Sequence, residues 1–366
     1  MRAANRSGQG TLVWHPNFAT AVSLLVDAFG SIVSGRFWKA KSLVAVLALA
    51  MLHAFPAYDA VRSEFVESTW RSVQVKFDHP FTDMAKAFPP ASHEGKLTFR
   101  MTVPLLARTF HLGLRGILLF NGCLGVLLLY QVLALAHRLT ADRTVAFWVC
   151  LAIACAWPGQ TAFHEFRGGY YDAAALCALM LAMSARSAVA AWIWAFLAAW
   201  TDERSLVALP LVLTVSSHRA ALLAAGGGYV LARIALATSY ATPTEGIGLT
   251  VFLAQIATVP LGVWTGLGGG WILAAGSLIA LLRRRELHMA AVLAAAFGPV
   301  ILTAALVTDI TRSAAYCLPG VFAALSILNG GRRLRTPAIV GASLSFLIPS
   351  YYVEGLGIYR LHFFGM

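Results

Sequence analysis

The sequence predicts an all-α protein: a polytopic bundle of transmembrane helices that forms a single integral membrane domain over residues 1–366. Three observations favour this fold class. Hydrophobic residues make up 59% of the chain and charged residues only 12%, about half the charged share of an ordinary soluble domain. The mean hydropathy is +0.72. Apolar runs of about 17–25 residues recur along almost the whole length, and each can cross a bilayer as a helix.

The segment 1–42 is expected to lie on the cytoplasmic side as a polar tail followed by an amphipathic helix. Phe18–Ser34 carries apolar residues on one helical face and polar residues on the other, which is typical of a helix lying flat on a membrane surface. Arg36, Lys39 and Lys41 then precede the first span. Cations are enriched in cytoplasmic segments, so these three hold the start of that span inside.

We expect about 10–12 membrane segments from the apolar runs. The first is Leu43–Ala57, and a long polar loop at residues 58–108 follows it. The later segments are Gly116–Ala136, Thr144–Trp157, Tyr171–Met183, Ala188–Trp200, Ser205–Val215, Ala220–Ala237, Leu249–Leu282, Met289–Val307, Ala314–Leu328 and Ala338–Tyr352.

The segment Leu249–Leu282 is expected to make one net crossing with a broken or re-entrant first half. Gly266, Gly268, Gly269 and Gly270 mark the break, and non-helical backbone at membrane depth has to be surrounded by protein or water. This glycine-rich stretch lacks the lysine and the preceding strand of a nucleotide-binding loop. No internal repeat is apparent along the chain.

The charges sort by side of the membrane. The net charge of +12 follows the positive-inside rule, so no nucleic acid partner is inferred from it. With the topology above, the basic turns are cytoplasmic and the loop 58–108 is extracytoplasmic. Of the 16 acidic residues, all but Asp27, Asp142 and Glu286 lie in outer segments. We therefore expect a multi-pass protein of a bacterial inner membrane.

Polar residues suited to chemistry gather at four outer positions. Ionisable residues at helix ends within apolar sequence are costly to bury and are more often functional than exposed ones. The four clusters are Asp59; Asp78, His79 and Asp83 with His93, Glu94 and Arg100; the stretch HEFRGGYYD at 164–172; and the stretch TDER at 201–204.

The acids and histidines of the loop have functional and structural interpretations. Asp78 or Asp83 could act as a general base that removes a proton from an acceptor hydroxyl. The structural alternative is a solvated loop acid or, for Asp83, a helix N-cap. His79, His93 and His164 could bind a divalent cation with nearby carboxylates, although no HxxxH spacing occurs.

The outer arginines also have two interpretations. Arg100, Arg108 and Arg167 could bind a phosphate through paired hydrogen bonds, or extend to lipid headgroups at the interface. The stretch LTFRMTVPLLAR at 97–108 is too apolar for a solvated loop and is expected to lie along the membrane surface. Arg233 lies well within an apolar run and needs a carboxylate or water as its partner.

The group Asp202, Glu203 and Arg204 opens an apolar run. Consecutive residues on a helix do not face each other, so we expect their charges to have different partners. A link from Arg204 to an acid on an adjacent helix, such as Asp172, is one candidate.

The chain resembles a known class of enzymes in its architecture and in two motifs. A cytoplasmic start, one span and a long acidic outer loop come first. An aspartate then opens one helix in YYDAAALCALMLAM, and an acid and arginine group opens the helix after next in WTDERSLVALPLVL. In these features about the first 215 residues resemble the GT-C class of membrane glycosyltransferases. Two features differ from the common pattern: no acidic pair directly follows the first span, and no soluble domain follows the last.

The resemblance implies transfer of a sugar from a polyprenyl-phosphate carrier to a glycan or lipid acceptor on the outer face of the bilayer. By position in the first outer loop, it implies Asp59, Asp78 or Asp83 as the catalytic acid. A divalent cation stays open as a cofactor, and no metal ligand is assigned. The residues that the resemblance implies for substrate binding are Arg100, His164, Glu165, Arg167, Asp172, Asp202, Glu203 and Arg204.

Two other functions fit the same sequence. A polymerase or ligase of surface polysaccharide would also use lipid-linked substrates and a large outer loop. A transporter of lipid-linked glycans would be expected to carry polar residues near the bilayer midplane and paired inverted repeats. The acids gather at the outer ends of the helices instead, which favours the transferase.

Overall fold

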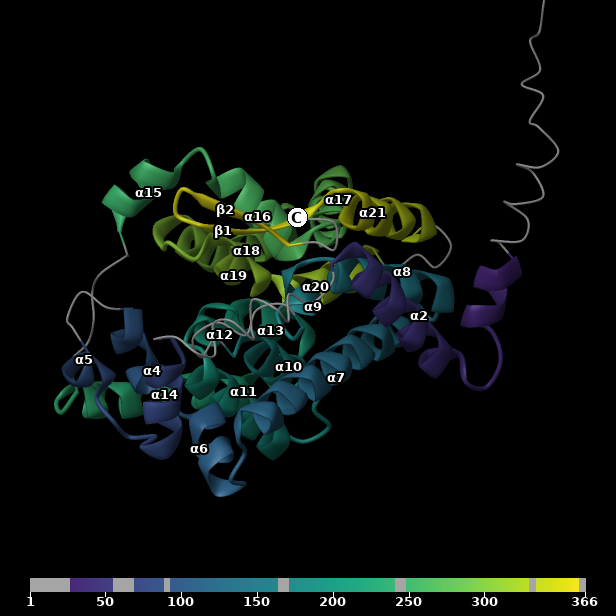
Figure 1. The fold of residues 1–366 in the computed structure, drawn as a ribbon. Helices are drawn as coiled ribbons and strands as arrows, with labels where there is room; N and C mark the ends of the chain where they lie inside the picture. The colour runs from purple at the N-terminus through teal and green to yellow at the C-terminus, as the bar shows by residue number, and fades with distance from the viewer. Residues whose placement is uncertain are drawn as a thin grey trace, which may run out of the picture.

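The computed structural model describes residues 27–54, 69–88, 93–163, 171–240, 248–328 and 334–361. Within these residues the chain is almost entirely helical and contains one two-stranded antiparallel sheet. The predicted all-α class is therefore confirmed, with a small exception at the end of the chain (Figure 1).

The first half of the chain builds short helices around one long one. Several of these helices are capped by polar side chains: Asp142 accepts from the amides of Thr144 and Val145, and Ser187 accepts from that of Ala190. The elements are α2 (Trp38–His53), α4 (Thr69–Asp78), α5 (Met84–Ala87), the 3-10 helix η1 (His93–Phe99), α6 (Thr102–Thr109), α7 (Leu114–Thr140), α8 (Arg143–Ala154), α9 (Trp157–Gln160), α10 (Asp172–Ser184) and α11 (Ala188–Thr201).

The second half ends in a β-hairpin. Its elements are α12 (Arg204–Val207), α13 (Leu209–Val215), α14 (Arg219–Ala237), α15 (Leu249–Gln255), α16 (Val259–Leu267), α17 (Gly270–Arg283), α18 (Leu287–Leu306), α19 (Ile310–Ala315), α20 (Leu318–Leu328), α21 (Arg335–Leu347), β1 (Ser350–Glu354) and β2 (Gly357–Leu361).

The helices form two layers with short helices between them (Figure 1). The upper layer holds α15 to α18, α21 and the hairpin, and the lower layer holds α4 to α7, α10, α11 and α14. Between the layers lie α9, α12, α13 and α20. The stretch Ile310–Leu328 has 89% of its spanning window buried, against 22% for Arg219–Ala237, so α19 and α20 form the centre of the fold.

Within the described residues, four helical stretches are long and apolar enough to cross a membrane: Gly116–Thr140, Arg219–Ala237, Leu287–Leu306 and Ile310–Leu328. A fifth is added if α15 and α16, which are bent by 91° at their junction, are one span. Shorter apolar helices accompany them. Length and composition thus agree with an integral membrane protein, while the larger number of segments expected from the sequence stays a prediction.

Proline breaks several of the predicted spans. Pro158, Pro210, Pro260 and Pro319 each occupy the first turn of a helix that follows a short interruption. Proline lacks the amide hydrogen that an interior helical position needs, but it is well accommodated in the first turn. The predicted span Ser205–Val215 is consequently divided between α12 and α13.

The predicted glycine break within Leu249–Leu282 is confirmed. The chain leaves α16 at Gly268, whose φ of +53° favours glycine, and α17 begins at Gly270. A Cβ on Gly269 would meet the carbonyl oxygen of Gly341 at 1.9 Å. The glycines therefore allow the break to approach the backbone of α21 directly.

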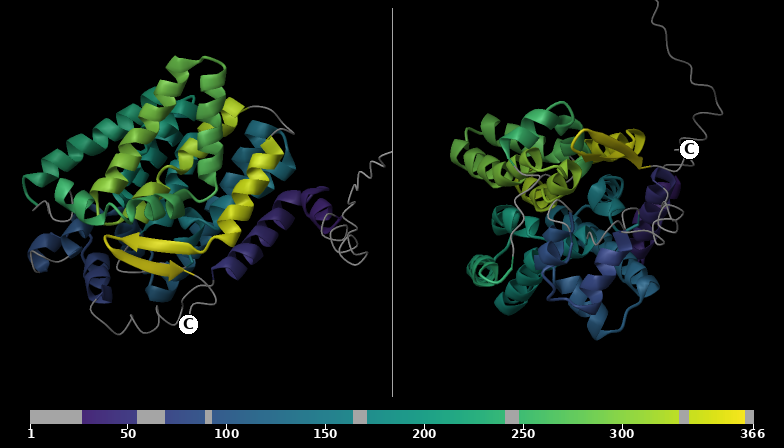
Figure 2. Two further views of the ribbon diagram at one scale, coloured as in Figure 1. Left: turned by 90° about the horizontal axis from the view of Figure 1, so that it is seen from above. Right: turned by 60° about the vertical axis from the view of Figure 1, so that its left-hand side comes forward.

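The last predicted span, Ala338–Tyr352, is wrong at its end. The helix α21 stops at Leu347, and the next residues form the hairpin (Figure 2). Strand β1 packs against α16 and α19. Proline 349 and the β-favouring sequence SYYV explain the change of structure. A two-residue turn with φ of +57° at Gly355 closes the hairpin, as primed turns require.

The predicted cytoplasmic turns before α8 and α21 meet at one end of the molecule. Arg335 at the start of α21 pairs with Asp142 at the start of α8 at 2.7 Å. Arg143 donates to the carbonyl of Gly35 at 3.5 Å. The helices α2, α8 and α21 share this end, on the right in Figure 1, while α4, α5 and α15 lie at the other. The side of the membrane on which this end lies stays a prediction.

Candidate functional site: a buried arginine and aspartate network

The site is built around Asp172, the first residue of α10, and Arg312 of α19. The Nε of Arg312 donates to Asp172 Oδ2 at 2.7 Å, and a terminal nitrogen donates to Oδ1 at 3.0 Å. Both side chains are fully buried. Paired hydrogen bonds between a guanidinium and a carboxylate are among the strongest polar contacts in proteins, so this pair fixes α19 against α10.

A second pair joins Arg204 of α12 to Asp309, which precedes α19. A terminal nitrogen of Arg204 donates to Asp309 Oδ2 at 2.7 Å. The same oxygen accepts from Arg312 at 2.9 Å. Asp309 is therefore shared by arginines from two helices that are more than 100 positions apart in the sequence.

Three members of these pairs, Arg204, Asp309 and Arg312, come from two short sequences that resemble each other. Residues 201–205 read TDERS and residues 308–313 read TDITRS, and a helix ends before each. Arg204 reaches Asp202 of its own copy at 3.2 Å and Asp309 of the other at 2.7 Å. Arg312 reaches Asp309 of its own copy at 2.9 Å and Asp202 of the other at 3.6 Å. The copies are thus reciprocally paired.

The expectation for Asp202 and Arg204 is therefore corrected. Asp202 is not within a helix: it caps α11 in an extended conformation, with φ of −152°, so its side chain turns back toward Arg204. Its Oδ1 also accepts from the backbone amide of Arg204 at 3.0 Å. The partner of Asp172 is Arg312 rather than Arg204.

The segment between α2 and α7 contributes Arg100. Its guanidinium lies 3.3 Å from Asp202 and 3.4 Å from Glu203. Backbone contacts hold it there, because Met101 donates its amide to the carbonyl of Trp200 at 2.9 Å. Burial alone would lower the pKa of Arg100, but the two carboxylates raise it above its ordinary value. Arg100 thus stays charged and ties the loop to the end of α11.

Aromatic side chains close the network on the side of the hairpin. The indole of Trp157 donates to Asp172 at 3.3 Å, and the hydroxyl of Tyr352 donates to Asp309 at 3.1 Å. The two rings stack with centroids 5.1 Å apart. Burial and the neighbouring Asp309 raise the pKa of Glu354, the next acid on β1. The hairpin therefore brings another carboxyl close to the network.

Glu203 is the part of the network most open to solvent. Its side chain is 37% exposed, whereas that of Asp202 is fully buried. Burial alone would raise the pKa of Glu203, but Arg100, Arg204 and Arg233 lower it to about 2. A carboxylate of such low pKa is a weak base. It is better suited to accept hydrogen bonds from hydroxyl groups than to remove a proton.

The loop acids lie outside this network. Asp78, at the end of α4, is exposed, and Asp83 caps α5 by accepting from the amide of Ala85 at 3.2 Å. The structural interpretation of Asp83 as an N-cap is confirmed. Asp83 also pairs with Lys86 at 3.4 Å. Of the two acids, Asp78 has the carboxylate more available to a substrate.

Lys76 holds this loop together. It is buried, and its ammonium group donates to the carbonyls of Thr98 at 2.7 Å and Thr82 at 3.2 Å. Burial lowers its pKa from 10.5 to about 8, partly offset by the charge of Asp83. Lys76 therefore joins α4 to the segment that carries Arg100.

The structure brings together five of the predicted site residues, Arg100, Asp172, Asp202, Glu203 and Arg204. Four others, Asp59, His164, Glu165 and Arg167, lie outside the described residues.

Sequence reasoning missed Asp309 and Arg312 as site residues. The order of Thr, Asp, Arg and Ser that they share with residues 201–205, with one more residue between Asp309 and Arg312, was the signal that could have found them. Arg233, for which a carboxylate or water was expected, donates to the Tyr229 hydroxyl at 2.7 Å and lies 4.2 Å from the centre of the Phe99 ring, and its charge helps to lower the pKa of the Glu203 carboxylate.

Comparisons with known proteins give no indication of function. The chain matches no family model, and no curated protein or solved structure is significantly similar to it. Among the described residues, no group of three histidine, cysteine or acidic side chains is placed to hold a metal ion.

Proposed function

We propose that the chain is a membrane glycosyltransferase of the bacterial inner membrane. It would move a sugar from a polyprenyl-phosphate carrier to a glycan or lipid acceptor on the extracytoplasmic face. The observation that carries the proposal is the meeting of Arg100 from the first loop with the buried network at the ends of α10, α11 and α19. Buried ionisable residues among apolar helices are expensive and are most often functional.

The proposal assigns separate roles to the buried and the exposed groups. The buried pairs of Arg312 with Asp172 and of Arg204 with Asp309 would hold the helices of the site in place. Glu203, which is more exposed, would accept hydrogen bonds from sugar hydroxyls. Arg100, whose Nε is buried and has no hydrogen-bond partner among the described residues, would contribute positive charge beside the departing phosphate.

The reaction would be a displacement at the anomeric carbon. The oxygen of the acceptor hydroxyl forms the new bond to that carbon, and the bond from the carbon to the phosphate oxygen breaks. The phosphate leaves on its polyprenyl chain with the bonding electrons. Asp78, the more exposed loop acid, would accept the hydroxyl proton.

The proposal is tested by transfer of a radiolabelled sugar from a polyprenyl-phosphate donor, with purified protein in vesicles. Asp78→Asn is expected to reduce transfer by about 100-fold or more, as loss of a general base does. Glu203→Gln is expected to raise the KM for the acceptor more than it lowers kcat. Asp83→Asn is the matched loop variant, and it should retain most activity because Asp83 is committed to capping α5.

Two results would contradict the proposal. One is full activity of Asp78→Asn together with full activity of an Asp59→Asn variant, since both are loop acids that the resemblance implies. The other is absence of transfer by the wild type with any polyprenyl-phosphate sugar, while the protein stays folded. Analysis of product chain length separates a transferase from a polymerase, which would make long glycans rather than single additions.

The broken helices favour a second candidate, a transporter of lipid-linked glycans. The 91° bend between α15 and α16 and the glycine break before α17 are of the kind found where transporters bind substrate within the bilayer. A flipping assay with fluorescent polyprenyl-linked sugar in sealed vesicles distinguishes the two. Movement between leaflets without a new glycosidic bond would favour the transporter.

A further inference from the structure

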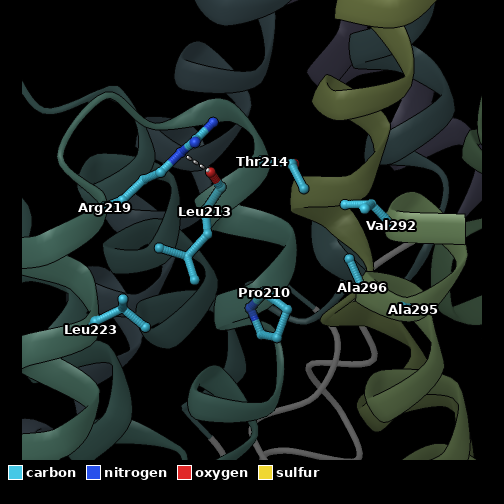
Figure 3. A pocket seen from close by; sticks show the side chains of 8 residues that line it. All are labelled: Pro210, Leu213, Thr214, Arg219, Leu223, Val292, Ala295 and Ala296. Atoms are coloured by element: carbon cyan, nitrogen blue, oxygen red, sulfur yellow. Dashed lines mark hydrogen bonds between the residues drawn. The ribbon is translucent and has the colours of Figure 1, made fainter. Parts of the chain in front are cut away.

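A groove opens on the surface of the helices away from the charged network. It has a volume of about 450 Å³ and lies between α13, α14 and α18 (Figure 3). A volume of this size is in the range of small-molecule sites. Its lining residues are Pro210, Leu213, Thr214, Arg219, Leu223, Val292, Ala295 and Ala296.

The sequence makes this groove hollow and apolar. Helix α18 presents Ala295 and Ala296, whose small side chains leave room between α18 and α13. Leu223 is 58% exposed and Val292 is 42% exposed, although both lie on helices long enough to cross a membrane. The hydroxyl of Thr214 donates to the carbonyl of Leu211 at 2.6 Å, so it needs no partner in the groove.

One end of the groove carries a positive charge. Arg219 opens α14, and its Nε donates to the carbonyl of Leu213 at 3.1 Å (Figure 3). This bond leaves both terminal nitrogens of the guanidinium without a hydrogen bond to any described residue. A fork of donors at the mouth of an apolar groove complements a phosphate attached to a hydrocarbon chain.

The predicted topology indicates which leaflet of the bilayer the groove faces. The charge distribution puts the turn before α14 in the cytoplasm, where the bilayer surface is rich in anionic lipid. A helical rise of 1.5 Å per residue puts Pro210 about 8 Å deeper than the end of α13. The groove therefore extends from the interface into the cytoplasmic half of a hydrocarbon core about 30 Å thick.

We propose that this groove binds an anionic phospholipid of the cytoplasmic leaflet, with its phosphate on Arg219 and an acyl chain along α13 and α18. The lipid secures α18, which leads directly to Asp309 of the network, against α13. The site is distinct from the charged network and does not depend on the transferase proposal. Binding is measured without any turnover.

The experiment measures binding of spin-labelled phosphatidylglycerol to the purified full chain in phosphatidylcholine vesicles, by the immobilised fraction of the spectrum. Arg219→Gln is expected to weaken the preference for phosphatidylglycerol over labelled phosphatidylcholine about fivefold. Ala295→Trp is expected to remove the immobilised component by filling the groove from an exposed position. The matched controls are Arg186→Gln, another exposed cation of a predicted cytoplasmic turn, and Ala294→Trp, its neighbour on α18 that does not line the groove.

Each outcome of this experiment either supports or overturns the proposed lipid site. Loss of preference in Arg219→Gln and Ala295→Trp, with both controls unchanged and all variants melting like the wild type, supports the site. Equal effects of Arg219→Gln and Arg186→Gln would show only a general attraction of cations to the anionic surface and would overturn it. Displacement of the bound probe by polyprenyl phosphate at lower concentration than by unlabelled phosphatidylglycerol would also overturn the assignment to a phospholipid.

Discussion

Two ion pairs in different parts of the molecule have the same shortest distance between their atoms and different surroundings. The Nε of Arg312 lies 2.7 Å from Asp172, and the Nε of Arg335 lies 2.7 Å from Asp142. Arg312 and Asp172 are fully buried, whereas Arg335 is 44% exposed. The distance between the atoms therefore does not rank the two pairs. The contribution of each pair to stability depends on how far water is excluded from it, because a buried charge that loses its partner cannot be solvated by water instead.

In the exposed pair, the carboxylate also has hydrogen-bond donors other than its arginine, namely backbone amides at the start of α8. Asp142 accepts from the amides of Thr144 and Val145 at the start of α8. Burial alone would raise the pKa of Asp142, but the hydrogen bonds from Arg335 and these amides lower it. If Arg335 is removed, the carboxylate keeps its capping role and gains water. We expect the contrast between the pairs to appear directly in stability measurements.

The largest effect is expected for Arg312→Met. The substitution leaves Asp172 buried and without its guanidinium, and it removes a partner of Asp309. Loss of one member of a buried pair typically destabilises by about 3–5 kcal/mol. Thermal unfolding in detergent and the monodisperse fraction on size exclusion should both fall sharply. An Arg312→Met variant as stable as the wild type would show that burial does not make this pair important for stability.

Removing both members of the buried pair should restore part of this loss. In the double variant Asp172→Leu with Arg312→Met, no carboxylate is left unpaired at position 172, and recovery of about 1–3 kcal/mol over Arg312→Met is expected. A double-mutant cycle on thermal stability measures the coupling. Strict additivity of the two single effects would show that the side chains do not interact as their distance indicates.

Lys76 offers an intermediate case, a buried cation held mainly by carbonyl groups. Its pKa is about 8 in the folded protein and 10.5 in its ordinary state. Between these values the unfolded chain binds more protons, so the contribution of Lys76 to the unfolding free energy rises with pH. We expect the wild type to gain about 1–3 kcal/mol relative to Lys76→Met from pH 8 to 10.5. A pH-independent difference in melting temperature between the two proteins would contradict the lowered pKa.

The smallest effect is expected for Arg335→Met. Pairs with an exposed member contribute about 0–1 kcal/mol, and salt screens them. The melting temperature should change by a small amount in low salt and by less in high salt. A loss comparable to that of Arg312→Met would show that burial does not separate the two pairs.

The sequence was sufficient for the features that depend on local composition. Apolar runs predicted the helical membrane fold, and the glycines near Gly268 predicted the broken helix. The TDER stretch at 201–204 and Asp172 were selected as candidate site residues in two separate clusters, which the structure brings together. Each of these follows from residue type and position along one segment, so no knowledge of distant contacts was needed.

The partners within the cluster were decided by tertiary structure. Sequence patterns showed neither that Asp172 would bind Arg312, 140 positions away, nor that β1 would bring Tyr352 to Asp309. A charged residue in an apolar helix needs a counter-charge, but the sequence does not show which of several arginines supplies it. Only the packing of α10, α12 and α19 in three dimensions selects the pairs, because the energy of a buried charge depends on which groups exclude water from it.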